Sequence, residues 1–198
     1  CKGIISTFVR PQPVLQKSFV DISKEVSPNS FKGQRALVIG GSRGLGEIST
    51  KILAAGGANV HFTYYQGKHD AQQLLSEINN GTMTHNTFKF DIFNTHKNQE
   101  IKRLESLTHL YYFATPSILS HTGLSFDNKL FCHLNEAYIT GLSRLIGELY
   151  KSGCKKLKVF SPSSIFVEEQ PKGFAEYSAA KAAFEIAIKS LEAKYSGL

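Results

Sequence analysis

The chain has 198 residues, of which 41% are hydrophobic and 20% are charged. This length and composition predict one globular domain with a substantial core that needs no disulfides. The longest apolar runs, such as 36–39, are far too short to span a bilayer, so we expect no membrane segment. The first residues also lack the apolar stretch and cleavage site of a signal peptide.

The net charge is +7, but the basic residues are scattered along the chain. A phosphorylated cofactor or an acidic substrate carrier explains this bias at least as well as a nucleic acid, so we expect no nucleic-acid partner. The three cysteines form no CxxC pair, and the seven histidines form no HxH or HExxH pattern. We therefore expect no disulfide framework, no metal site and a cytoplasmic location.

Residues 1–33 contain proline- and serine-rich breaks, which predict an N-terminal extension or linker. Beyond residue 34, apolar strands alternate with amphipathic helices. The expected strands cover 35–39, 59–64, 87–91, 110–114 and 157–161. The expected helices cover 44–55, 128–150 and 174–195, and one more contains 71–78. This alternation predicts an α/β fold over residues 34–198, a Rossmann-like doubly wound parallel sheet.

A glycine-rich turn follows the first expected strand directly and precedes the first expected helix. Its residues are Gly40, Gly41, Ser42, Arg43, Gly44, Leu45 and Gly46. Glycines at this place allow a tight turn and let the backbone approach a pyrophosphate at the helix N-terminus. The turn therefore predicts a dinucleotide site, with an empty structural turn as the alternative.

The end of the second expected strand bears on the choice of dinucleotide. An NAD site usually has an acidic residue there to bind the ribose 2′-hydroxyl, but this strand ends in Phe62, Thr63, Tyr64 and Tyr65. Arg43 could instead pair with a 2′-phosphate, with help from Lys68. NADP(H) is therefore favoured over NAD(H).

A tyrosine and a lysine lie one helical turn apart in the last expected helix, at Tyr177 and Lys181. A neighbouring ammonium favours the phenolate, which makes a tyrosine a competent general acid or base. Ser164 lies thirteen residues before Tyr177, just past the fifth expected strand. Because ligands bind beyond the carboxyl ends of parallel strands, these three residues can converge, although Ser164 could also be an ordinary loop serine.

The ordered set of the glycine motif, Asp91, Ser164, Tyr177 and Lys181 resembles the short-chain dehydrogenase/reductase family over about 34–198. The resemblance implies that Tyr177 protonates a carbonyl oxygen as hydride arrives from the nicotinamide. It also implies that Ser164 positions the carbonyl, while Lys181 tunes Tyr177 and holds the nicotinamide ribose.

The resemblance extends to four further positions and fails at two places. Asp91 would contact the adenine amino group, and Tyr64, Ile92 and Ala114 complete the expected cofactor site. Asn135 resembles the family asparagine that sustains a proton-relay water, although a helical asparagine could simply face solvent. The family's Asn-Ala-Gly appears here as Phe113, Ala114 and Thr115. The chain is also expected to lack the family's usual C-terminal strands and substrate lid.

These observations predict an NADPH-dependent oxidoreductase that reduces a ketone to a secondary alcohol. A 3-oxoacyl or polyketide-type thioester is an attractive substrate, because the proline-containing N-terminal stretch could tether the domain within a larger multidomain enzyme. The last expected helix is apolar on more than one side, which suggests a homo-oligomer, burial against the family's C-terminal part, or a helix deep in one core. A non-catalytic Rossmann scaffold or cofactor sensor, and a nucleotide-sugar epimerase or dehydratase, remain as alternatives.

Overall fold

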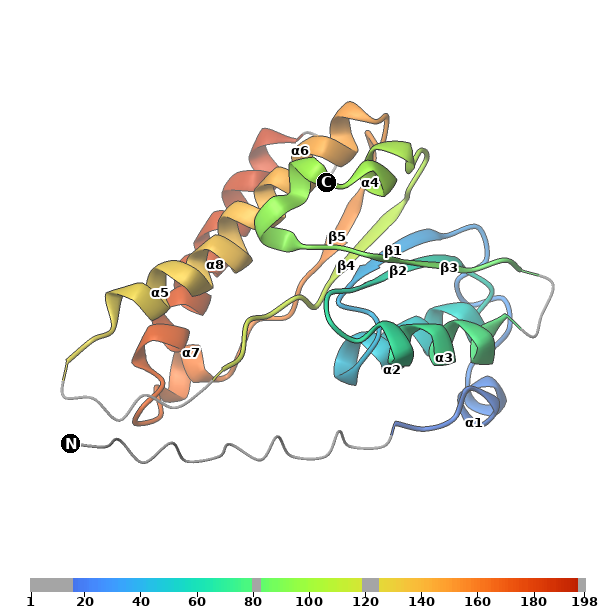
Figure 1. Ribbon diagram of the computed structural model, residues 1–198, viewed down its shortest axis with the longest axis horizontal. Coiled ribbons are helices and arrows are strands. Elements are labelled where there is room, and N and C mark those ends of the chain that lie inside the picture. Colours follow the sequence, from blue (N-terminus) through green and yellow to red (C-terminus); the bar gives the residue numbers. More distant parts are fainter. Residues whose placement is uncertain (1–15, 80–82, 119–124, 196–198) are drawn as a thin grey trace.

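The computed structural model describes residues 16–79, 83–118 and 125–195 (Figure 1). The first fifteen residues of the expected extension lie outside this range. Among the described residues, no helix combines the length and apolarity that crossing a membrane requires. The described histidines, cysteines and acidic residues form no group of three that could hold a metal ion.

Five parallel strands form the sheet, in the order β3-β2-β1-β4-β5. Their bounds are β1 Arg35–Ile39, β2 Asn59–Tyr64, β3 Asn86–Lys89, β4 His109–Tyr112 and β5 Lys158–Phe160. The order reverses at β1, because β2 pairs with one of its edges and β4 with the other. This is the predicted Rossmann-like doubly wound fold, and its switch point lies beyond the carboxyl ends of β1 and β4.

Alternating side chains of β1 build two separate cores. Ala36 and Val38 lie in a core with the buried residues of α2 and α3. Leu37 and Ile39 lie in the larger core with the long helices on the opposite face. Because every side chain from Ala36 to Ile39 is buried, the strand reads as the continuous apolar run that a sheet covered on both faces requires.

The helices divide between the two faces of the sheet (Figure 1). One side carries α2 Gly44–Ala55 and α3 Lys68–Ile78, with α1 Phe19–Glu25 packed against α2. The other side carries α4 Gln99–Arg103, α5 Asn128–Asn135, α6 Leu142–Lys151 and α8 Ala175–Lys194. A 3-10 segment, η1 Ile92–Lys97, follows β3, and the short helix α7 Phe166–Glu169 precedes α8.

The helix predicted over 128–150 is continuous but irregular. A π-helical segment, η2 Glu136–Gly141, separates α5 from α6. A Cβ added at Gly141 would lie 2.4 Å from Ile92 Cγ1, so this segment packs closely on η1. Such π turns are rare and often occur at functional sites, because they change the direction of the side chains they carry.

The segment before β1 is folded against the domain from residue 16 onward. Ile22 of α1 is buried, and Lys51 of α2 donates to the carbonyl oxygen of Lys17 at 3.1 Å. Lys51 also pairs with Glu47 at 2.9 Å and Glu77 at 3.1 Å. This buried ammonium therefore connects the segment before α1 with α2 and α3.

Candidate cofactor and catalytic site

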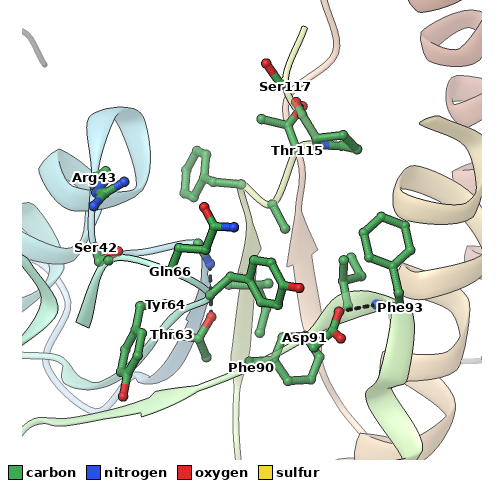
Figure 2. A pocket seen from close by; sticks show the side chains of 18 of the residues that line it. Ser42, Arg43, Thr63, Tyr64, Gln66, Phe90, Asp91, Phe93, Thr115 and Ser117 are labelled. Atoms are coloured by element: carbon green, nitrogen blue, oxygen red, sulfur yellow. Dashed lines mark hydrogen bonds between the residues drawn. The ribbon is translucent and has the colours of Figure 1, made fainter. Parts of the chain in front are cut away.

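A cleft of about 670 Å³ opens at the carboxyl ends of β1 to β4, at the switch point of the sheet. Figure 2 shows side chains from the glycine turn on one side and from the segment after β4 on another. Seven predicted cofactor residues line this cleft, namely Gly40, Ser42, Arg43, Tyr64, Asp91, Ile92 and Ala114. Gly41, Gly44, Leu45, Gly46 and Lys181 belong to the same prediction but do not line it.

Close backbone packing explains the glycines of the turn. Gly40 has a φ of +74°, and its amide donates to Thr63 Oγ1 at 3.0 Å (Figure 2). A Cβ at Gly41 would lie 2.7 Å from Phe62 Cβ, and a Cβ at Gly46 would lie 2.1 Å from the carbonyl oxygen of Gly40. The start of α2 therefore lies directly on the turn, and its N-terminus faces the end of the strand as a phosphate site requires.

Arg43 precedes α2 at the edge of the cleft and makes no capping hydrogen bond with its side chain. Its Nε donates to Asp70 Oδ2 in the first turn of α3. The guanidinium also covers Gly67, where a Cβ would lie 2.8 Å from Arg43 Cζ. Arg43 is thus held over the loop after β2, in the region where an acidic residue marks an NAD site.

Asp91 follows β3 and lies at the floor of the cleft (Figure 2). Its Oδ1 accepts from the amide of Phe93 at 3.0 Å, and its Oδ2 accepts from Asn94 Nδ2 at 2.7 Å. The carboxylate therefore caps η1 as well as facing the cleft. Phe93 in turn stacks on His133 of α5, with ring centroids 4.7 Å apart.

Three of the predicted catalytic residues lie on the loop after β5 and on α8. Ser164 Oγ accepts from the amide of Phe166 at 3.2 Å, and the ring of Phe166 meets that of Tyr177 at 5.8 Å. Lys181 Nζ donates to the carbonyl oxygen of Pro162 at 2.9 Å. Tyr177 and Lys181 of α8 therefore both contact the segment that follows β5, through Phe166 and Pro162.

Lys181 is buried, with a relative exposure of 7%. Burial lowers the pKa of Lys181 to about 8, and the charge of Glu185 on the same helix opposes this shift. The described residues place no carboxylate within ion-pairing distance of its ammonium. Its nearest described partners are the Pro162 carbonyl and the ring of Tyr138, whose centroid lies 4.2 Å from Nζ.

Asn135 lies at the end of α5, one residue before the π-helical segment. Its Nδ2 donates to the carbonyl oxygen of Phe131 at 3.0 Å, and its buried Oδ1 has no hydrogen-bond partner among the described residues. No hydrogen bond in the described part of the chain joins Asn135 to Tyr177 or Lys181. Its role in a proton relay therefore stays a prediction.

Three residues that the sequence did not single out complete this region. Tyr138 contacts Lys181 and Tyr177, Thr115 links Tyr138 to the cleft, and Phe166 contacts Tyr177. Nothing in the spacing of Tyr138 distinguishes it from other aromatic residues of an expected helix. Thr115 has a weak signal, because it occupies the place of the glycine in the family's Asn-Ala-Gly.

Comparisons of sequence relate a short part of the chain to a known protein. No protein-family model matches the chain. A segment of 48 residues is 42% identical to the cyclic-di-GMP-binding biofilm dispersal mediator protein of Escherichia coli (strain K12), covering 24% of this chain and 20% of that protein.

Two solved structures superpose on most of the chain. A short-chain dehydrogenase from Burkholderia cenocepacia J2315, crystallised with NADP, has a TM-score of 0.69, an identity of 24% and coverage of 78% of this chain. A dehydrogenase/reductase from Sinorhizobium meliloti 1021 has a TM-score of 0.66, an identity of 26% and coverage of 79%. The chain spans 65% of the length of each. These matches confirm the predicted resemblance at the level of the fold.

Proposed function

We propose that this chain, which has the fold of the short-chain dehydrogenases/reductases, binds NADP(H) in its cleft and reduces a ketone to a secondary alcohol. The arrangement of the cleft carries this proposal. A glycine turn and an arginine border it on one side, and on another side Thr115 connects it to the Tyr177–Lys181 region. The proposed nucleotide site and the proposed proton donor would therefore lie next to each other.

The residues of the cleft fit a phosphorylated dinucleotide. The turn leaves no room for side chains at Gly41 and Gly46, so α2 begins directly against it. The backbone amides at this helix N-terminus would bind the pyrophosphate. Arg43 supplies guanidinium donors for a 2′-phosphate beside the loop after β2, where an acidic residue is missing. Asp91 and Ile92 would hold the adenine, and Ala114 would line the path between the two halves of the nucleotide.

When bound, NADPH supplies the hydride. The protein's part is to orient the ketone and to move one proton. Ser164 would hold the carbonyl oxygen with its hydroxyl, and Tyr177 would donate the proton that this oxygen needs as the carbonyl carbon accepts hydride. Lys181, whose ammonium is buried one helical turn after Tyr177, would hold the nicotinamide ribose.

The substrate proposed within this class is a 3-oxoacyl or polyketide-type thioester. The net charge of +7 supports this choice, because an acidic carrier that delivers a thioester is attracted to a basic protein. Simple ketones test the chemistry without the carrier, and carrier-bound substrates test the choice of subclass.

Nucleotide binding is the experiment that tests the proposal. The chain is titrated with NADPH and NADH while nicotinamide fluorescence is recorded. We expect a preference for NADPH, and we expect Arg43→Ala to weaken NADPH binding by about 10-fold or more while NADH binding changes little, because one charge-assisted contact to phosphate is lost. Arg103→Ala is the matched control, since this arginine lies on α4 with an exposed side chain and pairs with Glu100.

The outcomes separate the candidate functions. Failure to bind either nucleotide contradicts the proposal. Binding of NADPH without oxidation in the presence of ketones favours the cofactor-sensing scaffold instead. Oxidation that disappears in Tyr177→Phe supports the reductase.

A further inference from the structure

Tyr138 occupies an unusual place between the cleft and the catalytic helix. It lies in the π-helical segment η2 and is buried, with a relative exposure of 2%. Its hydroxyl and Thr115 Oγ1 are 2.6 Å apart and share a hydrogen bond, and Thr115 lines the cleft. One end of this side chain is therefore anchored at the wall of the proposed cofactor site.

The ring of Tyr138 faces the catalytic pair. Lys181 Nζ lies 4.2 Å from its centroid, within the range of a cation–π interaction. The ring of Tyr177 meets it edge-on at 6.3 Å, and Phe184 packs on it at 6.5 Å. The negative face of an aromatic ring thus supplies part of the environment that water would otherwise give to the ammonium.

Few other groups compensate the buried charge of Lys181. The Pro162 carbonyl accepts one of its three possible hydrogen bonds, and the ring centroid of Phe184 lies 5.2 Å from Nζ, farther than that of Tyr138. The carboxylate of Glu185 acts at longer range and itself accepts a hydrogen bond from Ser163. Tyr138 from η2, together with Tyr177 and Glu185 from α8, makes up the titratable surroundings of Lys181 among the described residues.

We infer that Tyr138 is a positioning residue for the proposed reduction, holding the Lys181 ammonium against its ring face while its hydroxyl fixes the ring to Thr115. The inference rests on the proposed function for its catalytic meaning. The contact between the Tyr138 ring and the Lys181 ammonium can be tested independently of that function. This contact keeps the ammonium at one place beside Tyr177 before any ligand binds.

Tyr112 provides a matched control within the same core. It is equally buried, and its hydroxyl donates to the carbonyl oxygen of Ala137 at 2.7 Å. No cation–π contact involves Tyr112 in the described part of the chain. A variant of Tyr112 therefore disturbs the core beside η2 without removing a ring face from Lys181.

Nuclear magnetic resonance of the lysine ε-methylene groups tests the inference on the whole chain without nucleotide. The Lys181 signal is assigned by its loss in Lys181→Met, and it is followed from pH 6 to 11. In the wild-type chain we expect ε-proton resonances shifted upfield by the rings of Tyr138 and Phe184, with the larger part from the nearer Tyr138. An unshifted signal contradicts the contact between ring and ammonium. This measurement uses only the wild-type chain and Lys181→Met, so it does not depend on the folding of any Tyr138 variant.

The variants give the second reading. Losing a cation–π contact should raise the acid dissociation constant of Lys181 about 2- to 30-fold in Tyr138→Leu, because the protonated form loses its partner. Tyr138→Phe keeps the ring face and should change the constant less than about twofold by the same reasoning. Tyr112→Phe and Tyr112→Leu should leave it unchanged.

The inference is wrong if Tyr138→Leu titrates like the wild type, or if Tyr112→Leu shifts Lys181 as much. If the circular dichroism of Tyr138→Leu shows loss of structure, Tyr138→Met keeps more of the side-chain volume and takes its place. NADPH titration of the wild type separates the proposed function from the proposed role of Tyr138. A chain that binds no NADPH contradicts the proposed function, while the lysine titration still decides the role of Tyr138.

Discussion

Replacement of Gly46 by alanine tests how closely α2 must approach the glycine turn. The added Cβ would lie 2.1 Å from the carbonyl oxygen of Gly40, 2.9 Å from its carbonyl carbon and 3.0 Å from Gly41 Cα. A relaxed carbon–oxygen contact needs about 3.3 Å, so the atoms overlap by roughly 1 Å. All three neighbours are backbone atoms, which cannot rotate away, so α2 must move.

Such overpacking costs about 1–3 kcal/mol, and backbone neighbours favour the upper end of that range. For a domain of this size the loss corresponds to a fall of roughly 2–12 °C in Tm. Thermal and urea unfolding followed by circular dichroism measure this loss. NADPH fluorescence is recorded on the same sample, because displacement of α2 also moves the proposed pyrophosphate site.

Gly147→Ala is the control with the opposite sign. Gly147 lies inside α6, and its added Cβ would meet only Tyr195 Oη, at 3.4 Å. Alanine in a helix interior should stabilise the chain by about 0.5–1 kcal/mol. If Gly46→Ala unfolds within a degree of the wild type and binds nucleotide equally well, the close approach of α2 to the turn does not exist.

Two further predictions concern buried ammonium groups. Lys51→Met should destabilise the chain by up to about 3 kcal/mol, less than for a fully buried pair because Glu47 and Glu77 keep some solvent contact. Amide hydrogen exchange should then accelerate in α1. Unchanged exchange there would show that Lys51 does not hold this segment. Lys181 has a pKa of about 8 in the folded chain against an ordinary value of 10.5. Between these pH values the unfolded chain therefore binds more protons at this residue, so Lys181 makes the free energy of unfolding rise with pH. Urea midpoints at pH 7, 8, 9 and 10 should therefore increase less steeply in Lys181→Met than in the wild type, and identical slopes would contradict the burial of this ammonium.

The fold was largely predictable because its signals are local in the sequence. Four apolar residues in a row at 36–39 predict a strand buried on both faces, and the structure divides them between two cores. The helix predicted over 44–55 is also confirmed, since α2 spans Gly44–Ala55. The bounds of β1 and β2 agree with the predicted ranges, while those of β3, β4 and β5 differ by one or two residues.

Several short elements were not predicted from the sequence. These are α1, η1, α4 and α7, which have between four and seven residues. Helices this short carry little periodicity, and tertiary contacts stabilise them more than their own propensity does. The buried contact of Ile22 and the cap that Asp91 provides to η1 are examples of such support.

The sequence by itself determined the order of strands and helices, the glycine turn and the spacing of Tyr177 and Lys181, because each depends on residues close together in the chain. Only the tertiary structure decided which side chains surround Lys181. Tyr138, Pro162 and Lys181 come from different elements, and a π-helical turn sets the direction in which Tyr138 points. Periodicity assumes a regular helix, so it could not show this contact. The pairing of Arg43 with Asp70 has the same origin, since it joins two helices that the sheet brings together.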